Sequence, residues 1–161
     1  MIQKSSTQIN AEQLRLHIRS TLQMLSLWSE SVEELLLGTS AQESHLGYYR
    51  RQIKGPARGI YQMEPNTERD IWINYLTYHR DLADAVHLIC GVSGPDPMAL
   101  EFNLAYQTIM ARLHYLRVKH PLPWKDDLDS QAEYWDKYYN CNPVKGFPSE
   151  YIRNYRRVVL S

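Results

Sequence analysis

Glu43 is the residue whose type and position most clearly suggest chemistry. It follows LLLGTSAQ (35–42), so it lies at the inner end of a helix that we expect to be buried. A carboxyl group there is partly removed from water, which disfavours its charged form and raises its pKa. A glutamate with a raised pKa can act as a general acid near neutral pH. The alternative is an ordinary glutamate on a solvated helix face, or one paired with Arg50 or Arg51.

The loop that follows combines small residues, hydrogen-bond donors and one aromatic ring. These residues are Gly55, Ala57, Arg58, Gly59, Tyr61 and Gln62. Small residues let backbone amides approach a bound molecule, and the aromatic ring offers a flat stacking face. The alternative is a connector rich in glycine and proline, which is common between helices.

The histidines, cysteines, basic residues and tryptophans of the chain predict no second catalytic or metal site. The six histidines show no HExxH motif and no ligand spacing with cysteine, so we expect no metal site and no cofactor. Cys90 and Cys141 make no disulfide framework, and we expect free thiols in a reducing compartment. The RNYRR stretch (153–157) is typical of a solvated helix face. The four tryptophans suit core positions, with stacking platforms as the alternative.

Apolar periodicity predicts that helices position these residues. We expect a loose polar arm at 1–9 and then one mainly α domain of about six or seven helices over 10–161. Asn10 is a plausible N-cap, with Gln13 as its capping-box partner, and Ser29 or Ser31 can cap the next helix. The expected helices cover about 10–28, 29–46, 64–76, 81–89, 97–116, 127–139 and 150–159, with loops at 47–63 and across YNCNPVKGFPSE (139–150).

Length and composition narrow the class of protein. The 161 residues suit one domain, with 43% apolar and 22% charged residues. The formal net charge is +0, which gives no long-range attraction to nucleic acid. No apolar run approaches the roughly 18 residues that span a bilayer. The start MIQKSSTQINAEQ has no apolar core, so we expect synthesis in the cytoplasm without a signal peptide.

Two segments together are more specific than either alone. Glu43-Ser44-His45-Leu46, followed by GPARGIYQMEP (55–65), resembles the first two motifs of the soluble lytic transglycosylases and goose-type lysozymes. Asn103-Leu104 and Tyr115-Leu116 resemble the start and end of a third family helix. Tyr138-Tyr139-Asn140, with Gly146 arriving late, loosely matches a fourth element. The resemblance covers roughly residues 30–160 and includes small phage-encoded members.

The resemblance implies a lysozyme-like domain that cleaves the β-1,4 bond between N-acetylmuramic acid and N-acetylglucosamine in peptidoglycan. It implies that Glu43 is the general acid. It also implies seven residues that bind substrate or shape its wall: Ser44, Gly59, Ile60, Tyr61, Gln62, Tyr139 and Asn140. Arg50, Arg51 and Lys54 would meet peptidoglycan carboxylates, or they form a solvated loop.

Two questions stay open at this level. Glycosidases ordinarily use two carboxylates, and Glu64, Glu68 and Asp70 are the nearest acids, none of them a convincing second group. A lone acid fits both the transglycosylase route and an inverting hydrolytic route. The resemblance and the missing signal peptide favour a phage protein carried in the virion that acts on the cell wall, with other virion proteins as partners. The alternative is a structural subunit of a phage tail or injection apparatus with little or no activity.

Overall fold

A computed structural model describes residues 9–140, 144 and 146–161. Residues 1–8 of the arm expected at 1–9 and the thiol of Cys141 lie outside these residues. Ile9, the last residue of the expected arm, is held to the domain, because its N–H donates to Leu46 O at 2.7 Å. The described chain is mainly helical, as predicted, with eight α-helices, one 3₁₀-helix and two isolated β-bridges. In the described part, no helix is both long and apolar enough to cross a membrane.

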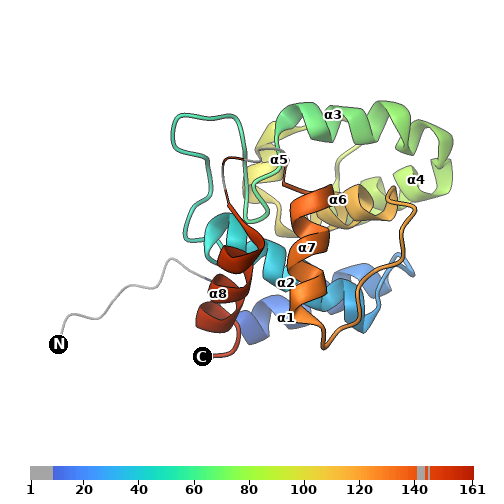
Figure 1. The fold of residues 1–161 in the computed structure, drawn as a ribbon. Coiled ribbons are helices and arrows are strands. Elements are labelled where there is room, and N and C mark those ends of the chain that lie inside the picture. The colour runs from blue at the N-terminus through green and yellow to red at the C-terminus, as the bar shows by residue number, and fades with distance from the viewer. Residues whose placement is uncertain (1–8, 141–143, 145) are drawn as a thin grey trace.

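The helix α2 (Glu30–Ser44) is central. It packs against α1 (Ala11–Gln23), α6 (Leu104–Leu116), α7 (Leu128–Tyr138) and α8 (Pro148–Val158) (Figure 1). Its run from Leu35 to Ala41 is fully buried, because neighbours cover it on all sides. Gly38 permits this packing, since a Cβ there would lie 1.9 Å from the Tyr151 hydroxyl. The close neighbour is thus a side chain and not another backbone.

The first two helices begin at the predicted caps. Asn10 Oδ1 accepts from the N–H groups of Glu12 and Gln13, and Ser29 caps α2. The predicted extent of the first helix was wrong, because α1 ends at Gln23. Ser26 takes a left-handed conformation there, and Leu25 and Trp28 pack against the core from the turn.

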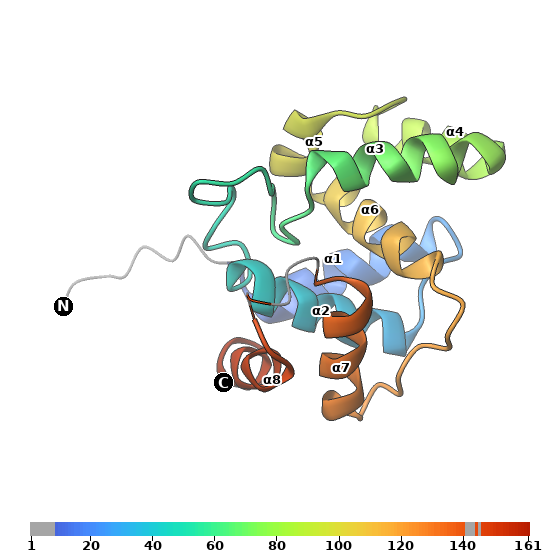
Figure 2. The same ribbon diagram turned by 45° about the horizontal axis from the view of Figure 1, so that its top comes forward.

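A second group of helices lies on the other side of α6 from α1 and α2. Both ribbon views show the two groups apart (Figures 1 and 2). The second group contains α3 (Pro65–Asn74), the 3₁₀-helix η1 (Leu76–Tyr78), α4 (Arg80–Cys90) and α5 (Pro97–Phe102). Pro65 and Pro97 each take a first-turn position, where the missing N–H of proline costs no hydrogen bond.

The prediction of one helix over 97–116 was wrong, because this segment forms two helices, α5 and α6, among the eight α-helices of the described residues. The helix is interrupted at Asn103, whose backbone is extended, with φ −100° and ψ 99°. Asn103 Oδ1 accepts from Tyr106 N at 3.1 Å and caps α6, while Nδ2 donates to Cys90 O at 3.1 Å. Asn103 thus caps one helix and anchors the end of another. It interrupts the helical backbone, while the apolar residues on either side keep a continuous helical spacing.

Candidate functional site

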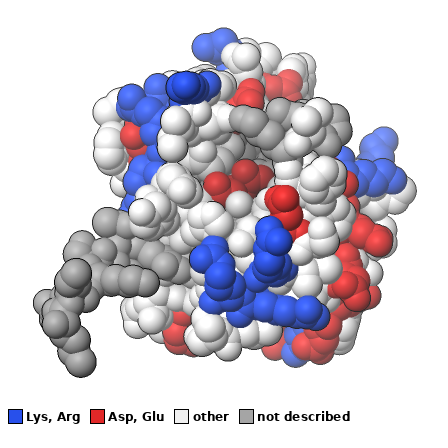
Figure 3. Space-filling view, turned by 60° about the vertical axis from the view of Figure 1, so that its left-hand side comes forward, with Lys and Arg blue, Asp and Glu red and all other residues white. Residues whose placement is uncertain are grey.

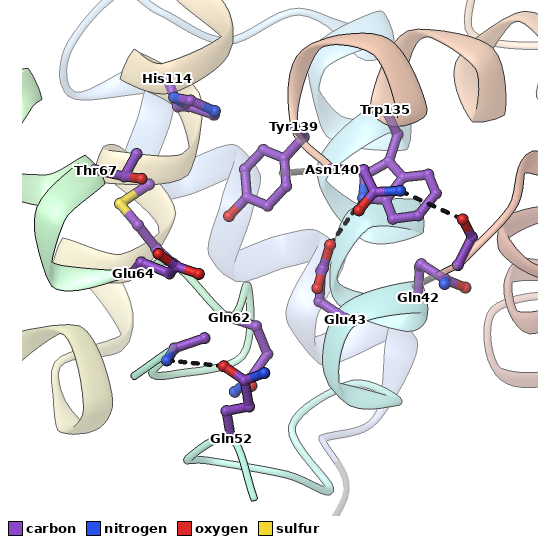
Figure 4. A pocket seen from close by; sticks show the side chains of 13 residues that line it. Gln42, Glu43, Gln52, Gln62, Glu64, Thr67, His114, Trp135, Tyr139 and Asn140 are labelled. Carbon is purple, nitrogen blue, oxygen red and sulfur yellow. Dashed lines mark hydrogen bonds between the residues drawn. The ribbon is translucent and has the colours of Figure 1, made fainter. Parts of the chain in front are cut away.

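A pocket of about 290 Å³ opens where the C-terminal ends of α2 and α7 meet the 47–63 loop and the start of α3 (Figure 4). Its volume is near the lower end of the roughly 300–1,000 Å³ that ligand pockets occupy. Its lining is rich in amides and contains two carboxylates: Gln42, Glu43, Gln52, Ala57, Gln62, Met63, Glu64, Thr67, His114, Trp135, Tyr139, Asn140 and Gly146.

Glu43 lies in the last turn of α2, where the chain is about to leave the core. The helix ends at Ser44, and His45 takes a left-handed conformation. Trp135 Nε1 donates to Glu43 Oε1 at 3.0 Å. Burial of the carboxyl raises its pKa to about 7, although the Trp135 hydrogen bond acts in the opposite direction. Glu43 forms no ion pair with any described residue, and Arg51 pairs with Glu101 instead.

The 47–63 loop is held tightly by its own chain. Arg58 forms β-bridges with Arg51 and with Met63. Gly59 has φ +77°, and a Cβ there would lie 2.1 Å from Leu100 O. Close packing inside the chain therefore explains this glycine, whereas the sequence suggested close approach to a ligand.

Four of the residues expected to bind substrate do not line the pocket: Ser44, Gly59, Ile60 and Tyr61. Ser44 Oγ donates to Ile60 O at 2.6 Å and accepts from Gly47 N at 2.8 Å, so it joins the end of α2 to the loop. The N–H of Ile60 donates to Gln107 Oε1 at 2.8 Å. The Ser44 hydroxyl and the Ile60 backbone therefore form hydrogen bonds within the protein, and these bonds position the loop.

Tyr61 is also internal, which contradicts its expected role as a stacking face. Its side chain is buried, and its hydroxyl bonds with Thr108 Oγ1 at 3.0 Å. Its carbonyl accepts from the Tyr139 hydroxyl at 2.7 Å. Tyr139 thereby joins the loop to the end of α7, while part of its side chain lines the pocket.

The other expected residues do line the pocket. Gln62, at φ +46°, donates from Nε2 to Gly59 O at 2.8 Å, which orients its amide. Asn140 Nδ2 donates to Asp136 Oδ1 at 3.0 Å and to Gly146 O at 3.4 Å. Figure 4 places Gln62 and Asn140 on different walls beside Glu43.

Two residues contribute more to this site than their sequence context predicts. Trp135 was expected to be a core anchor; it is buried, and it also holds the Glu43 carboxyl from 92 positions away along the chain. Glu64 received little weight as a second carboxylate, yet it lines the pocket, on the wall opposite Glu43 in Figure 4. Its position next to the Pro65 helix start was the available signal.

The other two candidate acids lie outside the pocket. Glu68 is buried and accepts from Asp96 N at 2.8 Å and from the Tyr106 hydroxyl. Asp70 pairs with Arg117 Nη1 at 2.5 Å. Both carboxylates bind groups of the chain itself.

His114 is a neutral side chain at the back of the pocket. Burial, followed by the charge of Arg117, lowers its pKa to about 4. Its Nδ1 lies 3.3 Å from Arg117 Nη2, and its ring meets that of Tyr139 edge to face, with centroids 5.1 Å apart. His114 therefore supports Tyr139 and carries no charge near pH 7.

No set of three or more His, Cys, Asp or Glu residues that could hold a metal ion occurs in the described part of the chain. Comparison of the sequence and structure with protein-family models, curated proteins and solved structures finds no match.

Proposed function

We propose that this protein cleaves the β-1,4 bond between N-acetylmuramic acid and N-acetylglucosamine in peptidoglycan, with Glu43 as the general acid. One observation carries the proposal: the Glu43 carboxyl, with a pKa of about 7, lines a pocket whose other walls are rich in amides. The motif resemblance of the 43–46 and 55–65 segments supplies the identity of the bond. The pocket beside Glu43 favours an enzyme over a purely structural subunit.

Glu43 is suited to donating a proton to the leaving glycosidic oxygen. With a pKa of about 7, roughly half of the molecules hold the proton near neutral pH. The Trp135 N–H bonds to Oε1, which restrains the carboxyl and stabilises its charged form once the proton has left. The same carboxylate can then act as a base.

The amide groups of the pocket suit an N-acetylated sugar. Gln42, Gln52, Gln62 and Asn140 place side-chain amides along its walls, and an amide contains both hydrogen-bond donors and an acceptor. Sugar hydroxyl and acetamido groups pair with both donors and acceptors. A ligand that lacks such groups would leave buried amides of the pocket unpaired, and this cost in free energy disfavours its binding. The Tyr139 side chain adds an aromatic edge to this wall.

Glu64 allows the two chemical routes to be distinguished. In an inverting hydrolysis, a second carboxylate activates water on the opposite face of the sugar. In the transglycosylase route, the 6-hydroxyl of the sugar attacks, and Glu43 alone takes its proton. Glu64→Gln should therefore abolish hydrolysis but leave anhydro-product formation largely intact.

The test is release of muropeptides from purified peptidoglycan, with products identified by mass. We expect wild-type protein to release them and Glu43→Gln to lose at least about a hundredfold in rate, as for removal of a general acid. Anhydro ends would establish a lytic transglycosylase, and reducing ends a hydrolase. Equal and negligible release from the two proteins would refute the proposal and favour a structural role.

A further inference from the structure

A short series of hydrogen bonds leads from the pocket to the exposed face of α8. Gln42 lines the pocket, and its Oε1 accepts from Asn154 Nδ2 at 2.8 Å. Asn154 Oδ1 in turn accepts from Arg157 Nη2 at 3.3 Å. The same Nη2 donates to Nδ1 of His45, two residues beyond Glu43, at 2.6 Å. Arg157 is thus an exposed cation that is linked to the pocket through the side chains of Asn154 and Gln42.

Further basic and aromatic side chains adjoin Arg157. Arg153 lies one helical turn earlier on α8 and is also exposed. On the other side, the His45 ring lies 5.8 Å from that of Tyr49, and the Tyr48 and Tyr49 rings meet edge to face at 4.9 Å. We call Arg153, Arg157, Tyr48 and Tyr49 the arginine rim.

The rim cations are available for a ligand. Arg15, Arg19, Arg51, Arg58 and Arg117 each pair with a carboxylate of the chain. The remaining arginines, Arg50, Arg69, Arg80, Arg112 and Arg156, form no ion pair with the described carboxylates. Arg153 and Arg157 form no ion pair with any described carboxylate. The bonds of Arg157 to His45 and Asn154 use one nitrogen, so Nε and Nη1 can still donate to a planar anion.

Lys and Arg side chains gather at two places on this face (Figure 3), although the formal net charge of the whole chain is +0. Figure 3 views the side carrying α8 and the 47–63 loop, and shows Lys and Arg side chains above and below a hollow that contains acidic atoms. A neutral glycan gives a guanidinium group no ionic partner. A ligand that fits both the hollow and its rim must carry anionic groups on branches outside the sugar chain.

We propose that the arginine rim binds the carboxylates of the peptide stems attached to the muramic acid residues, while Tyr48 and Tyr49 pack against the peptide. This inference rests on the proposed function and specifies its substrate: glycan that still carries peptide stems, in preference to bare glycan. Guanidinium groups bind carboxylates through two parallel hydrogen bonds, and tyrosine combines an apolar face with a polar tip.

The first test compares stem-bearing glycan strands with strands stripped of their peptides by an amidase. Hydrolysis of the amide bond leaves one lactyl carboxylate on each muramic acid, next to the sugar, whereas the carboxylates of the stems lie farther out. Wild-type protein should show a lower KM on stem-bearing strands. Arg157→Gln should raise that KM about fivefold, the loss expected for one exposed charge-assisted contact, and leave kcat and the KM on stripped strands unchanged. Arg157→Lys should recover only part of the affinity, because lysine lacks the planar donor pair.

Arg156→Gln is the matched control. Arg156 is exposed, adjoins Arg157 in sequence and carries the same charge, but α8 turns it away from Asn154. It should behave as wild type. Equal KM values on both substrates, or equal effects of Arg156→Gln and Arg157→Gln, would overturn the inference even if cleavage itself is observed.

A binding assay separates this inference from the proposed function. Binding of Glu43→Gln protein is measured on surface-immobilised glycan strands that carry peptide stems or have been freed of them, and on intact insoluble sacculi before and after removal of phosphate polymers. Binding that falls with loss of the stems, and with Arg157→Gln in this background, supports the rim whether or not wild type cleaves. Binding that depends on the phosphate polymers, or that ignores the stems, refutes it.

Discussion

Replacing Glu43 by glutamine should stabilise the folded protein at high pH. The folded-state pKa of this carboxyl is raised from 4.5 to about 7. Between these values the folded chain holds a proton that the unfolded chain has released, so the free energy of unfolding falls as pH rises across this window. The charged carboxylate is therefore a cost to stability above about pH 7, and Glu43→Gln removes it.

The size of the effect follows from the pKa. At about 1.4 kcal/mol per pKa unit, a rise from 4.5 to about 7 corresponds to at most about 3.5 kcal/mol. Glu43 lines a pocket that water can enter, which lowers the cost of its charge. We therefore expect Glu43→Gln to be about 2 kcal/mol more stable than wild type at pH 8, with the difference vanishing near pH 4.5.

Urea unfolding of both proteins at several pH values between 4.5 and 8.5 measures this difference without any substrate. The control is Glu133→Gln, an exposed glutamate of α7 that forms no ion pair with the described residues. Any difference between Glu133→Gln and wild type measures the general effect of removing one exposed carboxyl group, and it is subtracted from the Glu43→Gln result. A Glu43→Gln curve parallel to that of wild type would refute the argument that burial raises this pKa.

Three further predictions test the surroundings of the site. Trp135→Phe removes the hydrogen bond that lowers the pKa of Glu43, so NMR titration of the carboxyl should show a pKa about one unit higher. Gly59→Ala places a Cβ 2.1 Å from Leu100 O at φ +77°, and should lower the free energy of unfolding in urea by about 2–3 kcal/mol. The pKa of His114 is lowered from 6.5 to about 4, so its neutral form stabilises the fold above pH 6.5, and this stability is lost as pH falls toward 4. His114→Gln should lack this loss, and its unfolding free energy relative to wild type should rise by about 2 kcal/mol between pH 7 and pH 4.5.

Local signals predicted most helix starts, because a cap or a first-turn proline acts within a few residues of its own position. Asn10, Ser29 and Asp96 each accept from the backbone N–H groups that their helices leave unpaired. Asn103 carried the same signal, but the surrounding apolar period continued across it. The break there depends on its bond to Cys90 O, a contact that periodicity does not report.

The sequence by itself determined the helical class, the raised pKa expected of Glu43, and the pairing of a buried carboxyl with an amide-bearing loop. Tertiary structure decided which of the neighbouring residues face the pocket. The side chains of Ser44 and Tyr61 point into the protein because their hydroxyl groups form hydrogen bonds with Ile60 O and Thr108 Oγ1. Trp135 contacts Glu43 only because α7 packs against α2. The apolar periodicity of a segment reports which face is buried, but it does not report which distant segment packs against that face.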